Sequence, residues 1–138
     1  MGEVTVCAQS VVIGVPGRCI GVPPSGEYTL GNLDADEYRV SFQPAFDSNY
    51  VRQYYSEDHP GTIYFADATV LSLDASDDLT GIDAAIEEGA TISGTVVGEG
   101  DTGPIEGIQV CAEEIGGAWY QTCGQTQADG TYQVVGVR

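Results

Sequence analysis

Thr91-Ile92-Ser93-Gly94-Thr95-Val96-Val97 is the stretch that most directly indicates the fold of this chain. Its apolar side chains fall on every second position, which is the period of a β-strand with one buried face and one solvated face. Residues 38–42 and 69–73 follow the same period. The chain is therefore predicted to contain several short strands.

Turn-forming sequences separate the predicted strands, and they contain the Gly, Pro, Asp and Ser residues that tight turns favour. In residues 81–88 the Ala and Glu content favours a helix, but Ile82, Ala84 and Ile86 alternate, so we expect a strand there. Several strands at this spacing indicate an all-β fold with a β-sandwich architecture. The predicted turns are Pro23-Pro24-Ser25-Gly26, Gly100-Asp101-Thr102-Gly103-Pro104 and Ala128-Asp129-Gly130.

Four cysteines form two pairs with the same spacing, Cys7 with Cys19 and Cys111 with Cys123. An even number and a matched spacing favour two disulfides. The pairs contain no Cys-x-x-Cys motif and the lone His59 is distant in sequence, which argues against zinc. A bridge that closes a loop of this length stabilises the fold by about 3 kcal/mol and persists only in an oxidising compartment, so we expect an extracellular location.

The cysteine spacing belongs to an internal repeat with a period of 104 residues. Without a gap, residues 4–8 match 108–112 and residues 25–30 match 129–134. The chain therefore contains one full period and about a third of the next, as expected for a tandem repeat. This one shift aligns Cys7 with Cys111, Cys19 with Cys123, Gly26 with Gly130 and Tyr28 with Tyr132.

Three consecutive stretches resemble the carboxypeptidase regulatory-like domain, a family related to the Cna-B-type repeats of secreted bacterial surface proteins. They are Ile92-Ser93-Gly94-Thr95-Val96, Pro104-Ile105-Glu106-Gly107-Ile108-Gln109-Val110 and Ala128-Asp129-Gly130-Thr131-Tyr132. The resemblance implies an antiparallel Greek-key β-sandwich of the transthyretin-like or immunoglobulin-like kind. The isopeptide-forming branch of the family crosslinks a Lys to an Asn, and this chain has no Lys, so that chemistry is excluded.

The resemblance also implies a division of the chain into two incomplete repeats. Residues 1–89 would be the later part of one repeat, and residues 90–138 the opening part of the next. The first part would lack a leading strand and leave an open sheet edge. Residues 92–97 could complete it within the same chain, or in a neighbouring copy by strand donation, which propagates head-to-tail into a fibre.

Charge and composition exclude several functions. The formal net charge of −17 repels nucleic acids and anionic membranes, and no run of 18 apolar residues is long enough to span a membrane. Met1-Gly2-Glu3 has no features of a signal peptide, so the extracellular expectation depends on the cysteines. With one His, no Gly-x-Ser-x-Gly motif and no phosphate-binding loop, the chain is not expected to be an enzyme and needs no cofactor.

Two alternative binding functions stay open at this point. Asp74, Asp77 and Asp78, together with Asp34 and Asp36, supply the clustered oxygen ligands that Ca²⁺ prefers, although we favour solvated acidic turns as their explanation. Exposed aromatic rings could stack on a glycan, or they could be buried in a core or a subunit contact. The candidate rings are Trp119 and Tyr120, with Tyr50, Tyr54, Tyr55 and Tyr64 as a second group.

The function expected from these observations is structural. We predict a secreted, cell-surface module of tandem β-sandwich repeats, which acts as a stalk, fibre or adhesin spacer and whose partners are copies of itself or neighbouring repeats. The disulfides would take the mechanical role that isopeptide bonds have in related domains.

Overall fold

The computed structural model describes residues 3–15, 17–100, 102–115 and 121–138 and is all-β, with antiparallel sheets. It divides into two compact units. Unit 1 comprises Met1–Phe46 and Val51–Glu87, and unit 2 comprises Asp47–Tyr50 and Glu88–Arg138. The all-β antiparallel class predicted from the sequence is confirmed, whereas the Greek-key connection and the tandem repeat stay predictions. The described residues contain no helix long and apolar enough to cross a membrane.

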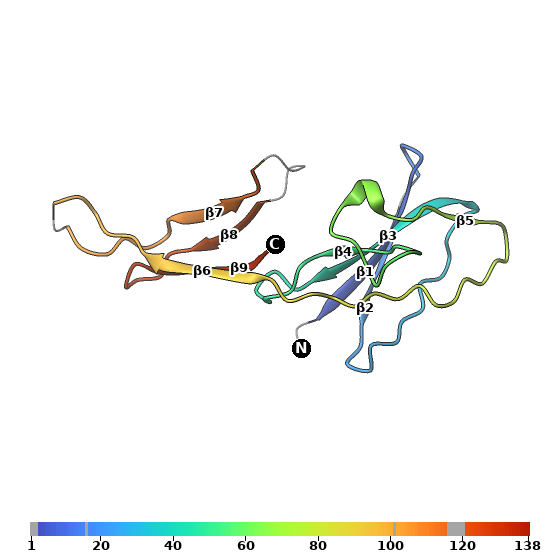
Figure 1. Cartoon of the computed structure of the whole chain (residues 1–138), viewed down its shortest axis with the longest axis horizontal. Coiled ribbons are helices and arrows are strands. Elements are labelled where there is room, and N and C mark those ends of the chain that lie inside the picture. The colour runs from blue at the N-terminus through green and yellow to red at the C-terminus, as the bar shows by residue number, and fades with distance from the viewer. Residues whose placement is uncertain (1–2, 16, 101, 116–120) are drawn as a thin grey trace. The chain divides into compact units, whose positions relative to one another are not determined.

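Unit 1 is built on one five-stranded sheet with the order β2-β1-β3-β4, in which β5 also pairs with β3 (Figure 1). Strand β1 lies between its two partners, so that Val6 is opposite Ile20 of β2 and opposite Phe42 of β3. A short 3-10 turn, η1, follows β4. The elements are β1 (Val4–Ser10), β2 (Arg18–Val22), β3 (Asp36–Pro44), β4 (Gln53–Tyr54), η1 (Phe65–Asp67) and β5 (Leu71–Leu73).

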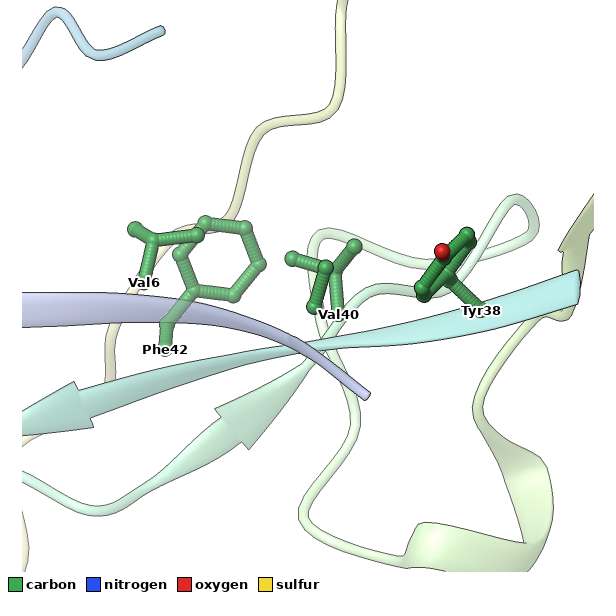
Figure 2. Close-up of a cluster of buried hydrophobic side chains, with 5 residues drawn as sticks. Val6, Tyr38, Val40 and Phe42 are labelled. Atoms are coloured by element: carbon green, nitrogen blue, oxygen red, sulfur yellow. The ribbon is translucent and has the colours of Figure 1, made fainter. Parts of the chain in front are cut away.

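The hydrophobic core of unit 1 lies on one face of β1 and β3. Side chains at alternate positions point to the same side of a strand, so Val6 and Ala8 share a face with Tyr38, Val40 and Phe42. Figure 2 shows four of these side chains standing together on that face. The cover is supplied by two extended segments, 26–33 and 79–86, whose inward side chains are Tyr28, Leu30, Leu33, Ile82, Ala84 and Ile86.

Residues 81–88 differ from the predicted strand. Ile82, Ala84 and Ile86 pack against the core as the alternation requires, although Gly81 has a left-handed φ of +73°. No ladder forms along them within the described residues, where the Ala85 N–H donates to the Pro60 carbonyl and the Glu87 carbonyl accepts from Val51. The alternation reports burial of one face, but a ladder also needs a neighbouring backbone in register.

Unit 2 consists of two pairs of strands, β6 (Ala90–Thr95) with β9 (Thr131–Val137) and β7 (Gln109–Glu113) with β8 (Gln121–Gln125). Asn49 joins this unit through its side-chain oxygen, which accepts from the Gly136 N–H at 3.0 Å and from the Thr91 hydroxyl at 3.2 Å.

The hydrophobic interior of unit 2 is small. Val134 is 1% exposed, whereas Ile92 is 45% exposed. Several further aliphatic side chains of the unit are also exposed. These are Val97, Ile105, Ile108 and Ile115.

Candidate functional site

Each unit contains one hairpin closed by a disulfide. In unit 1 Cys7 lies directly opposite Cys19, and in unit 2 Cys111 lies directly opposite Cys123. Both bridges are formed, both Cα–Cα distances are 4.1 Å, and no cysteine is free. The two disulfides predicted from the spacing are therefore present, and they fit an oxidising, extracellular environment.

The register of the two hairpins is also the same after a shift of 104 residues. In unit 1 Val6 pairs with Ile20, and in unit 2 Val110 pairs with Gly124. The disulfide therefore joins equivalent paired positions in the two hairpins.

A tight turn recurs at the same offset. The Gly26 N–H donates to the Pro23 carbonyl at 2.9 Å, and the Gly130 N–H donates to the Gln127 carbonyl at 2.8 Å. The φ angles of Gly26 and Gly130 are +80° and +77°. This left-handed region is accessible to glycine without steric cost, which explains why the sequence has glycine at both positions.

The residue before each of these glycines makes the same local hydrogen bond. The Ser25 hydroxyl accepts from the Glu27 N–H at 3.4 Å, and an Asp129 carboxylate oxygen accepts from the Thr131 N–H at 3.0 Å. Hydrogen bonds from the Thr131 hydroxyl and N–H hold the pKa of Asp129 below its ordinary value. Short polar side chains at these positions commonly bond to the backbone two residues ahead.

A second left-handed residue follows each turn. Asn32 has φ +57° and Gly136 has φ +66°, and these two positions are again 104 residues apart. Asn is one of the few side chains that adopts this conformation routinely. The hairpin register, the glycine turn and this second left-handed residue therefore recur at one offset, although the segment between the turn and that residue is strand β9 in unit 2 and has no ladder in unit 1.

A groove of about 790 Å³ lies in unit 1 between two extended segments, 26–33 and 79–83. Its floor includes Ala8, Tyr38 and Val40, so the groove reaches down to the hydrophobic core. Among the described residues, neither bordering segment is part of a sheet. A groove with an apolar floor and a polar, acidic rim, bordered by segments outside any sheet, is suited to an additional β-strand.

Tyr28 links the two borders of this groove. Its hydroxyl donates to the Ile82 carbonyl at 2.5 Å, and its ring packs edge-on against Phe42 with centroids 6.2 Å apart. Partial burial, followed by the nearby Asp83 carboxylate and Tyr55, raises the pKa of Tyr28 to about 12. The phenol is therefore neutral at physiological pH and keeps its proton for the hydrogen bond.

The predicted donor residues lie at the start of unit 2. Ile92, Ser93, Gly94 and Thr95 belong to β6, whereas Val96 and Val97 follow it. The Val96 N–H donates to the Gly130 carbonyl at 2.9 Å and extends the pairing beyond the strand. Val97 is 63% exposed and forms an isolated bridge with Pro104.

Of the acidic residues considered for calcium, Asp74, Asp77 and Asp78 are exposed around a turn, whereas Asp36 begins β3 and is half-buried. The Asp74 N–H donates to an Asp77 carboxylate oxygen at 2.8 Å, and the Asp77 N–H donates to the Asp74 carbonyl at 3.1 Å. Asp78 is exposed beside them, and Asp36 accepts from the Ser10 hydroxyl at 2.5 Å. Within the described ranges no three His, Cys, Asp or Glu side chains gather closely enough to hold a metal ion.

The aromatic residues considered for glycan binding lie in different surroundings where the structure describes them. Trp119 and Tyr120 lie outside the described residues. Tyr54 packs edge-on against Phe65 at 5.6 Å, and Tyr55 packs against the core. Tyr50 belongs to the other unit, and Tyr64 is 48% exposed. His59 is also exposed.

Comparisons with protein-family models, with curated proteins and with solved structures gave no match for this chain.

Proposed function

We propose that this chain is a non-enzymatic, extracellular structural module of tandem β-sandwich repeats, of the carboxypeptidase regulatory-like kind, which serves as a stalk, fibre or adhesin spacer. The observation that supports the proposal is that three local features recur at an offset of 104 residues. They are the disulfide-closed hairpin, the glycine turn and the second left-handed residue. Independent folds have no reason to share all three at one offset, whereas copies of a repeat do.

The two units pair an equivalent segment differently when they are compared as copies. In unit 2 strand β9 pairs with β6, whereas in unit 1 its counterpart, segment 26–33, has no partner strand in the described residues. A strand donated by a neighbouring module would supply that partner, and a contact of this heterologous kind extends head-to-tail.

The position of the disulfides supports a mechanical role. Each bridge joins directly opposed residues of a hairpin, so the residues between the two cysteines cannot be pulled out of the module. A chain with this feature resists extension without needing the Lys–Asn crosslink that the sequence excludes.

The acidic surface is consistent with the proposed extracellular location and disfavours the binding of polyanions. The net charge of −17 keeps separate chains soluble and repels nucleic acids and anionic lipids. At short range it also opposes association of the chain with itself, and this repulsion is screened by salt.

Negative-stain electron microscopy and analytical sedimentation of the oxidised chain test the proposal. We expect filaments of variable length at high protein concentration, and a distribution of species in sedimentation that shifts to larger sizes with concentration and salt. A strictly monomeric profile under all of these conditions would contradict head-to-tail assembly. Parallel measurements on the reduced chain serve as the control for dependence on the disulfides.

A further inference from the structure

We propose that the groove of unit 1 binds strand β6 from a second copy of this chain, in the register that β6 has with β9 in its own unit. This inference rests on the proposed function and names the acceptor, the donor and the paired residues. The incoming strand would lie between segments 26–33 and 79–83. Together the three would form the second sheet of a β-sandwich over the core of β1 and β3.

The register follows from the repeat. In unit 2 Ser93 is opposite Gln133 and Ile92 is opposite Val134. Subtracting the offset of 104 residues places Ser93 of one copy opposite Thr29 of the next, and Ile92 opposite Leu30. Directly opposed residues share a face of the sheet, so Ile92 would point with Leu30 toward the core.

The donor strand gains burial in this arrangement. Ile92 is 45% exposed in its own unit, where Val134 is its cross-strand neighbour. Inside the groove it would be covered by apolar groups such as Leu71 and Leu73. The exchange replaces the β6–β9 ladder of the donor by a ladder with segment 26–33, so the added burial of Ile92 favours it and the unpairing of β9 opposes it.

Gly94 is the residue that the acceptor requires opposite Tyr28. In unit 2 Gly94 pairs with Tyr132, and a Cβ on Gly94 would lie 2.8 Å from the Tyr132 hydroxyl oxygen. Tyr28 is the repeat counterpart of Tyr132, and its ring already extends across the groove to Ile82. A strand with glycine at this position can pass without displacing that ring.

Gly26 provides a second steric match. A Cβ on Gly130 would lie 2.5 Å from the Val96 carbonyl oxygen, because the chain that follows β6 passes beside it. Its counterpart Gly26 has nothing within 4 Å of the same position. In the proposed register Val96 of an incoming strand would occupy this open space beside Gly26.

Charge determines the conditions for this association. Residues 90–95 carry no charge, whereas Asp74, Asp77 and Asp83 border the groove and Glu87 and Glu88 precede the donor strand. The strand itself is compatible with the acidic border, but its flanks are repelled by it. We therefore expect the exchange to be stronger at about 1 M salt, where charges are screened beyond roughly 3 Å.

The decisive experiment is intermolecular disulfide trapping with the full chain. A Thr29→Cys variant is mixed with a Ser93→Cys variant of different mass, and the mixture is oxidised in 1 M NaCl. Both native residues are exposed, and the proposed register brings their Cβ atoms within the range of a disulfide. We expect a dominant heterodimer, and peptide mapping should locate the new bridge with the two native bridges intact.

The matched control pairs Thr29→Cys with Thr95→Cys, because Thr95 is on the same face as Ser93 but two residues out of register. Equal trapping in the two mixtures would overturn the proposal. Filaments on the grid without the Thr29–Ser93 bridge would also overturn it and leave the proposed function standing. Trapping that yields only closed dimers would support the pairing and contradict the fibre.

A steric variant tests the acceptor without new cysteines. Gly26→Asn places a Cβ where the Val96 carbonyl would lie, and we expect association to weaken by about tenfold or more, as for an overpacked contact. Gly14→Asn is the control, since Gly14 has φ +96°, has open space around it and does not line the groove. Equal association of the two variants would contradict the proposed acceptor.

Discussion

The proposed mechanical role predicts a defined gain in extensible length when the disulfides are removed. The chain held between two handle domains is stretched by optical tweezers, first oxidised and then in the presence of a reductant. Cys7 and Cys19 are 12 residues apart in sequence, which at about 3.6 Å per residue is about 43 Å of extended chain. The bridge holds their Cα atoms at 4.1 Å, so about 39 Å of chain cannot extend while the bridge is intact.

The second bridge has the same separation and the same Cα–Cα distance. Reduction should therefore lengthen the fully extended chain by about 78 Å, out of roughly 500 Å for 138 residues. A Cys7→Ser, Cys19→Ser variant should already be longer by about 39 Å and should gain only the other half on reduction. Equal extended lengths of the oxidised and the reduced chain would refute the reasoning, because the bridges would then not prevent the segments between the cysteines from extending.

Three further outcomes are expected, each with its own measurement. Chemical unfolding followed by circular dichroism should show that Tyr28→Phe, which loses the hydrogen bond to the Ile82 carbonyl, is less stable by about 1 kcal/mol at pH 7. The pKa of Tyr28 is about 12 in the folded chain against an ordinary 10.0, so its contribution is complete below pH 10 and is lost between pH 10 and 12. The free energy of unfolding of the native chain should therefore fall by about 1 kcal/mol between pH 10 and 12, after allowance for the partial exposure of Tyr28, and that of the variant should fall less. Identical dependence of stability on pH in the two chains would contradict the assignment. In the dilute monomer Gly26→Ala should lower the stability by about 1–2 kcal/mol, because alanine is strained in the left-handed conformation. Gly130→Ala should lower it by about 1–3 kcal/mol more, because its Cβ also meets the Val96 carbonyl. Thermal unfolding of the two variants measures the difference, and equal losses of stability would argue against it. Calcium and chelator should leave the Tm of the native chain unchanged within about 1 °C, because no carboxylate cluster is assembled in the described residues; a calcium-dependent rise would show a site that these residues do not form.

The sequence by itself determined the features that depend on neighbouring residues. The spacing of Cys7 and Cys19 predicts a bridge because a hairpin with a short loop brings such residues opposite each other. The alternation in residues 38–42 predicts β3 because a strand has a period of two. Gly26 and Gly130 predict turns because few other residues adopt a left-handed backbone.

The same local reasoning could not assign partners to extended segments. Residues 28–30 and 132–134 have similar patterns, yet residues 132–134 belong to strand β9 whereas residues 28–30 border the groove. Residues 81–88 alternate like a strand, but they have no ladder in the described part of the chain. Whether a segment pairs depends on a second backbone in register, and that backbone is distant in sequence.

Only the tertiary structure decided where the candidate site lies. The groove exists because β1 and β3 present Ala8, Tyr38 and Val40 beneath two segments that are more than 40 residues apart in sequence. Likewise, Asn49 lies in the sequence between strands of unit 1, but its side chain accepts hydrogen bonds from Thr91 and Gly136 of unit 2. Periodicity and turn chemistry are properties of a short stretch of chain, whereas a groove is a property of contacts between distant stretches, which no single stretch encodes.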